Sequence, residues 1–376
     1  MKVIVWQNML SHLQAAHVRA LADRGVDVTI VGLDELSPER RALGWTVPDF
    51  GRARAIASPT WQQTLMLIRE SGQGVHILAG WRGMRYGKRL LAELESQSAC
   101  IGLLTEGCET GGWRGLARRV VYWKDALLHG SRLDFILAMG AQGISWFRQC
   151  GYPAEKLYPY GYFTERPAVS ASSTPREDVF ELIYLGHCVE RKGLDMAVRA
   201  LAGLTRLRWR LSVIGSGPAA QSWRHLAERL GIGSRVSFSG ALPYQDAMSR
   251  LAKSDLLLLP SRFDGWGAVV NEALMLGVPA MCSDACGAKD LLGEAWRGEI
   301  FPSGSVGALQ TTLEARIAGG RLNREGRQRI EQWSRCLEGD SGAEYILSVI
   351  RHVYDGGPRP VAPWMAESAT GVMCTA

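Results

Sequence analysis

The sequence predicts an α/β protein with two Rossmann-like β/α/β domains, each a parallel sheet covered by helices on both faces. Short apolar runs alternate with helical periodicity along most of the chain. These runs form two series, separated by a stretch of small residues and prolines over 166–176. The length of 376 residues is enough for two domains, each with its own hydrophobic core.

The first series places strands in the N-terminal half, with helical patterns between them, as at 11–24 and 84–97. Its expected strands are 2–6, 27–32, 75–79, 99–104 and 134–138. We therefore expect an N-terminal domain over 1–165, followed by an interdomain linker over 166–176.

The second series lies after the linker and predicts a C-terminal domain over 177–330. Its expected strands are 181–186, 209–214, 235–239, 255–259 and 278–282. Residues 331–355 are expected to be helical, and one arrangement returns them to the N-terminal domain. The tail, 356–376, combines prolines with small residues and is predicted to be disordered.

Composition limits the class of protein. Hydrophobic residues make up 47% and charged residues 21%, as in globular proteins, and the apolar runs are shorter than the roughly 18 residues of a membrane span. The eight cysteines are scattered without a Cys-x-x-Cys pair, which favours reduced thiols and a cytoplasmic location. The histidines show no metal-site spacing, and the net charge of +6 favours anionic ligands without indicating nucleic acid.

The most informative segment runs from Leu256 to Pro279. Four leucines predict a buried strand, and an Asp-Gly-Trp-Gly turn over 264–267 lets the backbone approach a ligand closely. A helix is expected from about 268 to 276. A strand, a glycine turn and a helix in this order form a phosphate-binding unit, and the carboxylates of Asp264 and Glu272 flank it.

A basic turn follows the first strand of the C-terminal domain. That strand ends at Gly186, and Arg191 and Lys192 come just before the next helix. Two cations at the carboxyl end of a strand suit a diphosphate, although a solvated basic turn has the same sequence. A phosphate site becomes the better interpretation because the Asp264–Glu272 segment is expected at the same sheet edge.

A glycine turn follows the next strand, with Gly215 and Gly217 in a Gly-x-Gly-x-x-Ala pattern. A dinucleotide site would require an acidic residue at the end of the following strand. That strand ends instead in Gly240, Ala241 and Leu242. The pattern therefore favours a tight turn beside a bound nucleotide over a dehydrogenase site.

Two features of the N-terminal half carry weaker functional signals. Glu106 stands where an expected strand gives way to a glycine-rich loop, so it can face a ligand or be an ordinary loop acid. Cations interleave with Trp and Tyr over 81–89 and again over 114–124. This pattern suits an anionic membrane surface, with a solvated helix face as the plain alternative and single-stranded nucleic acid as a remote one.

Together these motifs resemble the retaining nucleotide-sugar glycosyltransferases of family 4, which have the two-domain GT-B architecture. The resemblance covers about 181–295, where the family's motifs occur in the family's order. It implies two domains facing a central cleft. The N-terminal half resembles the family only in its β/α alternation, as expected for a domain that binds varied acceptors.

The resemblance also implies roles for particular residues. Glu272 would bind the ribose hydroxyls, Asp264 would contact the donor sugar, and Arg191 and Lys192 would stabilise the departing diphosphate without a metal or other cofactor. Glu106 would assist near the acceptor. The implied donor site comprises Gly186, His187, Arg191, Lys192, Gly215, Gly217, Gly240, Ala241, Leu242, Asp264, Gly265, Trp266, Gly267, Ala268, Val269 and Glu272.

Three positions depart from the family pattern. Asp264 stands where the family usually has glutamate, and His187 where arginine is frequent. The first loop, 7–12, lacks the glycines often found there. These departures affect contacts to the sugar and shift neutralisation of the diphosphate onto Arg191 and Lys192.

The function implied is retaining transfer of a sugar from a UDP- or GDP-sugar to a saccharide or lipid-linked saccharide, in polysaccharide or cell-surface glycan synthesis. The location would be cytoplasmic, with peripheral binding to the inner face of the membrane through the N-terminal domain. A nucleotide-sugar epimerase of the same plan and a non-catalytic nucleotide-sugar binding protein are the alternatives.

Overall fold

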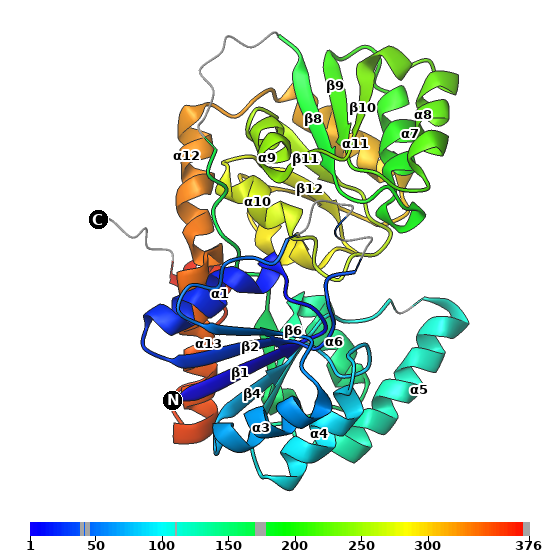
Figure 1. Ribbon diagram of the computed structural model, residues 1–376. Helices are drawn as coiled ribbons and strands as arrows, with labels where there is room; N and C mark the ends of the chain where they lie inside the picture. Colours follow the sequence, from blue (N-terminus) through cyan, green and yellow to red (C-terminus); the bar gives the residue numbers. More distant parts are fainter. Residues whose placement is uncertain (38–40, 42–45, 110, 170–177, 371–376) are drawn as a thin grey trace. The chain divides into compact units, whose positions relative to one another are not determined.

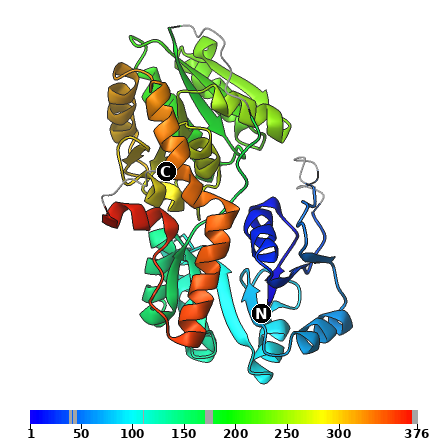
Figure 2. The same cartoon turned by 90° about the vertical axis from the view of Figure 1, so that its left-hand side faces the viewer.

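The computed structural model describes residues 1–37, 41, 46–109, 111–169 and 178–370. The chain divides into two compact units, which Figures 1 and 2 show from two directions. One unit comprises Met1–Glu165 with Cys336–Ala376, and the other comprises Arg166–Arg335. Residues 170–176 of the expected linker lie outside the described residues, and the predicted cleft between the domains stays a prediction.

The N-terminal unit contains, within its described residues, a seven-stranded parallel sheet of order β3-β2-β1-β4-β5-β6-β7. Its strands are β1 (Lys2–Gln7), β2 (Asp27–Gly32), β3 (Arg54–Ala57), β4 (Val75–Leu78), β5 (Cys100–Thr105), β6 (Phe135–Met139) and β7 (Leu157–Tyr160). The five expected strands are present. The two additional strands, β3 and β7, form the edges of the sheet.

Helices cover both faces of this sheet (Figure 1). Those that follow its strands are α1 (His12–Asp23), α3 (Trp61–Ser71), α4 (Gly87–Ser96), α5 (Gly112–His129) and α6 (Gly140–Gln149). Buried leucines of α3 and α4, such as Leu67 and Leu90, join Trp6 of β1 in one core cluster. Helix α3 begins at a capping box in which Thr60 and Gln63 satisfy each other's backbone N–H groups.

The C-terminal segment belongs to the same unit as the N-terminal sheet. Helix α13 (Gly339–Asp355) packs along α1, as Figure 2 shows. A Cβ atom on Gly339 would lie 2.5 Å from the carbonyl oxygen of Ala16, so glycine is needed for this close approach. The Tyr345 hydroxyl on α13 donates to the carbonyl of Pro159, which lies in edge strand β7.

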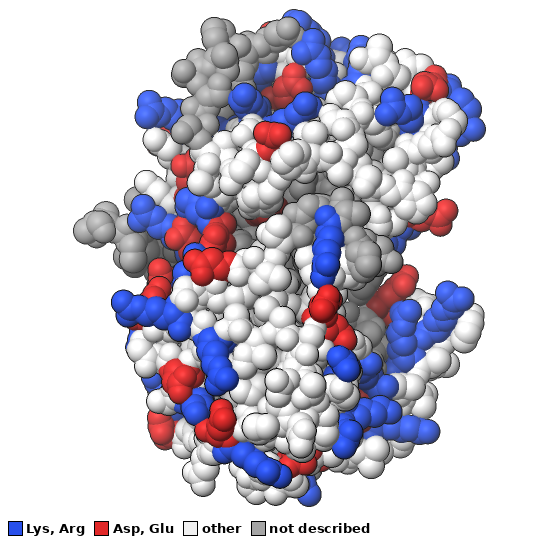
Figure 3. All heavy atoms as spheres, viewed as in Figure 1, with Lys and Arg blue, Asp and Glu red and all other residues white. Residues whose placement is uncertain are grey.

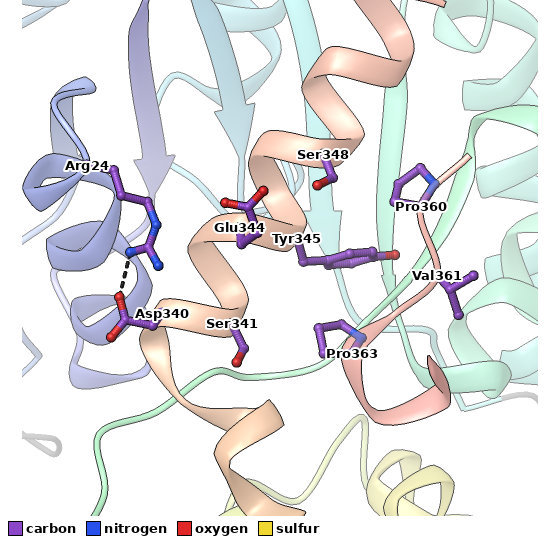
Figure 4. A pocket seen from close by; sticks show the side chains of 9 residues that line it. All are labelled: Arg24, Asp340, Ser341, Glu344, Tyr345, Ser348, Pro360, Val361 and Pro363. Carbon is purple, nitrogen blue, oxygen red and sulfur yellow. Dashed lines mark hydrogen bonds and ion pairs between the residues drawn. The ribbon is translucent and has the colours of Figure 1, made fainter. Parts of the chain in front are cut away.

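The described part of the tail predicted to be disordered, 356–370, instead includes α14 (Pro363–Thr370) and packs on the N-terminal unit, while 371–376 lie outside the described residues. Trp364 is buried against Phe163, with ring centroids 5.9 Å apart, and Arg359 donates to the carbonyl of Glu155 at 2.6 Å. These two anchors explain the difference from the sequence-based prediction, which considered only the prolines and small residues. A surface pocket of about 410 Å³ lies between this segment and α13 (Figure 4).

The C-terminal unit contains a six-stranded parallel sheet of order β10-β9-β8-β11-β12-β13 within its described residues. Its strands are β8 (Phe180–Leu185), β9 (Trp209–Ile214), β10 (Val236–Gly240), β11 (Leu256–Leu259), β12 (Ala280–Ser283) and β13 (Gly298–Phe301). Its helices are α7 (Leu194–Ala202), α8 (Ala220–Arg229), α9 (Tyr244–Ala252), α10 (Val269–Met275), α11 (Val306–Ala318) and α12 (Arg324–Trp333). The five strands and the Rossmann-like architecture expected here are confirmed.

The glycine turn after β9 makes a specific prediction about stability. Gly215 has a φ of +140°, and a Cβ atom there would lie 1.9 Å from the carbonyl oxygen of Gly186. Gly215→Ala should therefore lower the free energy of unfolding of the C-terminal unit by about 1–3 kcal/mol or more, because the backbone at Gly186 or Gly215 must move to make room for the Cβ atom. Thermal denaturation measures the effect.

The matched control is Gly307→Ala in α11, where an added Cβ meets nothing within 4 Å. Alanine is favoured over glycine inside a helix by about 0.5–1 kcal/mol, so this variant should be as stable as the parent protein or more so. Equal melting temperatures for the Gly215 variant and the parent would refute the close packing of the turn at Gly215 against the backbone of Gly186.

Candidate functional site

The strand order of the C-terminal sheet reverses between β8 and β11, which are neighbours. Chain segments leaving these two strands run to opposite sides, which opens a crevice at their carboxyl ends. The loop over 186–193 follows β8, and the loop over 260–268 follows β11. The structure therefore brings the two predicted phosphate-binding segments to the position where open α/β sheets bind ligands.

Backbone hydrogen bonds join the glycine turns at this edge of the sheet. The amide of Gly186 donates to Ile214 at 3.0 Å, and the amide of Gly215 donates to Gly240 at 2.8 Å. A Cβ atom on Gly217 would lie 2.8 Å from the ring of His187, so the second turn lies directly against the first. The loops after β8, β9 and β10 thus form one continuous surface.

Lys192 is held by Asp264, which connects the basic turn to the glycine bend after β11. Both side chains are largely buried, with 14% and 10% of their surface exposed. The neighbouring Arg191 donates to the carbonyl of Phe263 at 3.2 Å. The ammonium of Lys192 has three N–H groups, so the ion pair with Asp264 leaves donors that can meet a phosphate.

The basic turn is fixed further by residues that sequence reasoning did not select. The guanidinium of Arg262 donates to both carboxylate oxygens of Asp195, at 2.8 and 2.7 Å. Its backbone amide donates to the carbonyl of Arg191 at 2.7 Å. A bidentate Arg–carboxylate pair holds geometry well, so Arg262 positions the turn that carries the two cations. The signal available in the sequence was the position of Arg262, two residues before Asp264.

The bend over 264–268 lies against the loop that follows β12. The amide of Asp264 donates to Ala285 at 3.0 Å, and the amide of Ala288 donates to Trp266 at 2.8 Å. Gly267 has a φ of +96°, and a Cβ atom there would lie 2.6 Å from a methyl carbon of Leu259. The side chain of Trp266 is fully buried and donates to Asn271, so only its backbone can reach a ligand.

Glu272 lies in the first turn of α10, which Ala268 and Val269 begin. The residue is partly exposed, yet burial of its carboxyl group raises its pKa to about 7, and a hydrogen bond from Tyr244 works in the opposite direction. Tyr244 begins α9, directly after the Gly240–Leu242 loop. The structure thus connects Glu272 to the loop predicted to line the base, and Tyr244 is a site residue that sequence reasoning missed.

Glu106 belongs to the N-terminal unit and follows the carboxyl end of β5. It is exposed, and its carboxylate accepts a hydrogen bond from Tyr162 at 3.1 Å. A pocket of about 180 Å³ lies at the carboxyl ends of β4 and β5, lined by Arg82, Asp125 and Tyr152 among others. Its polar groups could bind a hydroxylated ligand in this unit.

The fold and site define a class, a two-domain α/β protein with the predicted anion-binding loops at a topological switch point of the C-terminal sheet. Residues 165–333, nearly the whole C-terminal unit, match the model of the family Glycosyl transferases group 1. This part of the chain is similar to that family, and the resemblance predicted from the sequence is confirmed.

Relatives and solved structures agree with this assignment. A GDP-mannose-dependent α-(1-6)-phosphatidylinositol monomannoside mannosyltransferase of Mycolicibacterium smegmatis is 28% identical over 51% of this chain and 55% of its own. The Mycobacterium tuberculosis CDC 1551 enzyme of the same name is 26% identical over 73% of this chain and 75% of its own length. Anabaena HepE in complex with UDP has a TM-score of 0.71 at 13% identity, covering 93% of this chain and 99% of that one.

These matches differ in what they establish. The structural similarity shows the GT-B fold. The chain spans about half the length of the M. smegmatis relative, so the activity of the whole protein is a proposal. In the described part of the chain, no helix combines the length and apolar character that a membrane crossing requires.

Proposed function

We propose that the protein transfers a sugar, with retention of anomeric configuration, from a nucleoside diphosphate sugar to a saccharide or lipid-linked saccharide acceptor. The observation that carries this proposal is the pairing of Lys192 with Asp264 at the switch point, beside Arg191. This arrangement places two fixed cations, which suit a diphosphate, beside a carboxylate that suits sugar hydroxyls. The named activities of the mannosyltransferase relatives support the reaction class.

The proposed chemistry depends on charge that develops as the donor breaks. The bond between the anomeric carbon and the diphosphate oxygen cleaves, so the leaving group gains negative charge while the sugar becomes cation-like. Arg191 and Lys192 stabilise the leaving group, and no reorganisation is needed because both are already positioned by hydrogen bonds. The carboxylate of Glu272 accepts hydrogen bonds from the ribose hydroxyls.

Retention requires that the acceptor attack from the face that the diphosphate leaves. The departing diphosphate can then take the acceptor's proton, so this step needs no additional side-chain base. Asp264 would orient the donor sugar while keeping Lys192 in place. Because Asp264 is one methylene shorter than glutamate, we propose that its main role is to position Lys192.

The acceptor is proposed to bind the N-terminal unit, with Glu106 and the pocket beside Arg82 as candidate contacts. A lipid-linked acceptor would be met at an anionic membrane surface, and we propose that this unit binds such a surface peripherally. The basic, aromatic segments over 81–89 and 114–124 support this location.

A thermal-shift screen with UDP, GDP, ADP and their sugars tests the donor site, and NMR of the reaction mixture tests the chemistry. We expect one diphosphate and its sugars to raise the melting temperature, and slow donor hydrolysis to release the sugar with its anomeric configuration retained. Activity should survive EDTA, because the cations are side chains.

Three results would contradict the proposal. Formation of an isomeric nucleotide sugar without acceptor would indicate an epimerase. Binding with neither hydrolysis nor transfer to added saccharides would indicate a binding protein. Loss of activity in EDTA that Mg²⁺ restores would show that the diphosphate is neutralised by a metal ion.

A further inference from the structure

Helix α5 (Gly112–His129) exposes a continuous apolar stripe. The stripe consists of Trp113, Leu116, Val120, Trp123 and Leu127. Their spacing of three and four residues places them on one face of the helix. Trp113 is 75% exposed and Leu127 is 65% exposed, and Leu128 beside the stripe is 70% exposed. Several large apolar side chains that are exposed to this extent on one helix indicate an interaction surface.

The opposite side of α5 attaches the helix to its unit. Gly115 and Asp125 are buried, and the Asp125 carboxylate accepts a hydrogen bond from Nε of Arg82 at 2.7 Å. The ring of Tyr122 packs edge-on against Trp146, with centroids 5.3 Å apart. The apolar stripe therefore faces outward because the helix is fixed by polar and aromatic contacts on its other side.

The exposed surface of α5 is also positively charged. Its cations are Arg114, Arg118, Arg119 and Lys124, and its single acidic residue, Asp125, is buried and paired with Arg82. Figure 3 shows Lys and Arg gathered over this helix. On a helical projection, Arg119 lies on one side of the apolar stripe and Lys124 and Arg114 on the other. Cations flanking an apolar stripe are the pattern of helices that lie in a membrane interface.

We propose that α5 is an interfacial helix that inserts its apolar stripe into the headgroup–acyl boundary of an anionic bilayer. The cations then lie at the level of the lipid phosphates. The inference rests on the proposed peripheral membrane location and specifies how it is achieved: through apolar insertion, and not through electrostatic attraction alone.

Charge favours a bilayer over a second copy of the chain. A symmetric pairing through α5 would bring Arg119 and Lys124, which flank the stripe, close to the same cations of the second helix, without an exposed acid on the helix to neutralise them. Anionic lipid removes this repulsion and at the same time accepts the apolar side chains.

The decisive experiment is vesicle flotation of the full-length protein. Vesicles of phosphatidylcholine alone are compared with vesicles that also contain phosphatidylglycerol. The test variant changes Leu116, Val120 and Leu127 to serine, and the matched control is Met66→Ser, which removes an exposed apolar side chain from α3 of the same unit. Melting temperatures with and without nucleotide verify that each variant is folded.

We expect the parent protein and the control to float with anionic vesicles, and the triple variant to bind at least tenfold more weakly. Vesicles with brominated acyl chains should quench tryptophan fluorescence in the parent protein, and Trp113→Phe should reduce that quenching. This second measurement does not depend on the folding of the triple variant.

Other outcomes overturn the inference. If the triple variant binds as well as the parent, the membrane contact is electrostatic and the peripheral location stands without insertion. If the parent binds no vesicle, both insertion and the membrane location fail. A concentration-dependent dimer, seen by light scattering and lost in the triple variant, would assign the stripe to a second copy. None of these results bears on sugar transfer, which is tested with soluble substrates.

Discussion

Replacing Lys192 with alanine is expected to lower the rate of sugar transfer by about 10²–10³-fold, since a fixed donor that stabilises developing negative charge contributes about 2.7–4 kcal/mol to the transition state. The effect should appear mainly in kcat, because the charge on the diphosphate grows as the bond breaks. The measurement is initial rate against donor concentration. The control is Lys253→Ala, which removes an exposed cation after α9 in the same unit.

A second variant separates catalysis from folding. Removing Lys192 leaves the largely buried carboxylate of Asp264 without its cation, and breaking such a pair costs about 3–5 kcal/mol. The double variant Lys192→Met, Asp264→Asn also removes the charge of this carboxylate, so it should regain stability while remaining inactive. A single variant as active as Lys253→Ala would show that Lys192 does not stabilise the leaving group.

Glu272→Ala is expected to weaken nucleotide binding by at least tenfold. Each ribose hydroxyl would lose a hydrogen bond to a charged group, which contributes about 1.5–3 kcal/mol. Isothermal titration calorimetry with the preferred nucleoside diphosphate measures the change. Asn271→Ala is unsuitable as a control because Asn271 binds the indole of Trp266; Lys253→Ala serves here as well. Unchanged affinity would refute the ribose assignment.

The raised pKa of Glu272, about 7, gives this prediction a pH dependence. Ribose hydroxyls donate to the charged carboxylate, so nucleotide binding should lower the pKa and release protons near neutral pH. Affinity should therefore rise as the pH increases from 6 to 8, and Glu272→Gln should reduce that rise and the proton release. Titrations in buffers of different ionisation enthalpy measure the protons directly.

The same pKa shift has an opposite consequence for stability. The folded protein holds the proton of Glu272 more tightly than the unfolded chain, whose value is near 4.5. Its contribution to the unfolding free energy therefore falls as the pH rises from 4.5 to 7, in total by about 1–3 kcal/mol. Glu272→Gln, which carries no charge, should be more stable than the parent protein at pH 8.

The central strands were predictable because they are buried on both faces. The leucine run of β11 is fully buried, and such runs are visible in sequence. The strands that escaped prediction, β3, β7 and β13, are short edge strands. Strand β3 is largely exposed and β7 contains Pro159, so neither has the apolar run that indicates a strand.

The candidate site was predictable where it depends on glycines and charges that follow strands. Gly215, Lys192 and Asp264 lie where the strand order places them, because parallel strands end at one edge of the sheet. The contacts from Tyr244 to Glu272 and from Arg262 to Asp195 were not predictable, since each joins segments far apart in sequence. The anchoring of Trp364 on Phe163 is long-range in the same way.

A crystal structure of the protein with bound UDP or GDP tests the central claim most directly. The account predicts phosphate oxygens within hydrogen-bonding distance of Lys192 Nζ and the Arg191 guanidinium, with both ribose hydroxyls on the Glu272 carboxylate. A nucleotide bound elsewhere on the chain, with these three side chains turned away from it, would contradict the account.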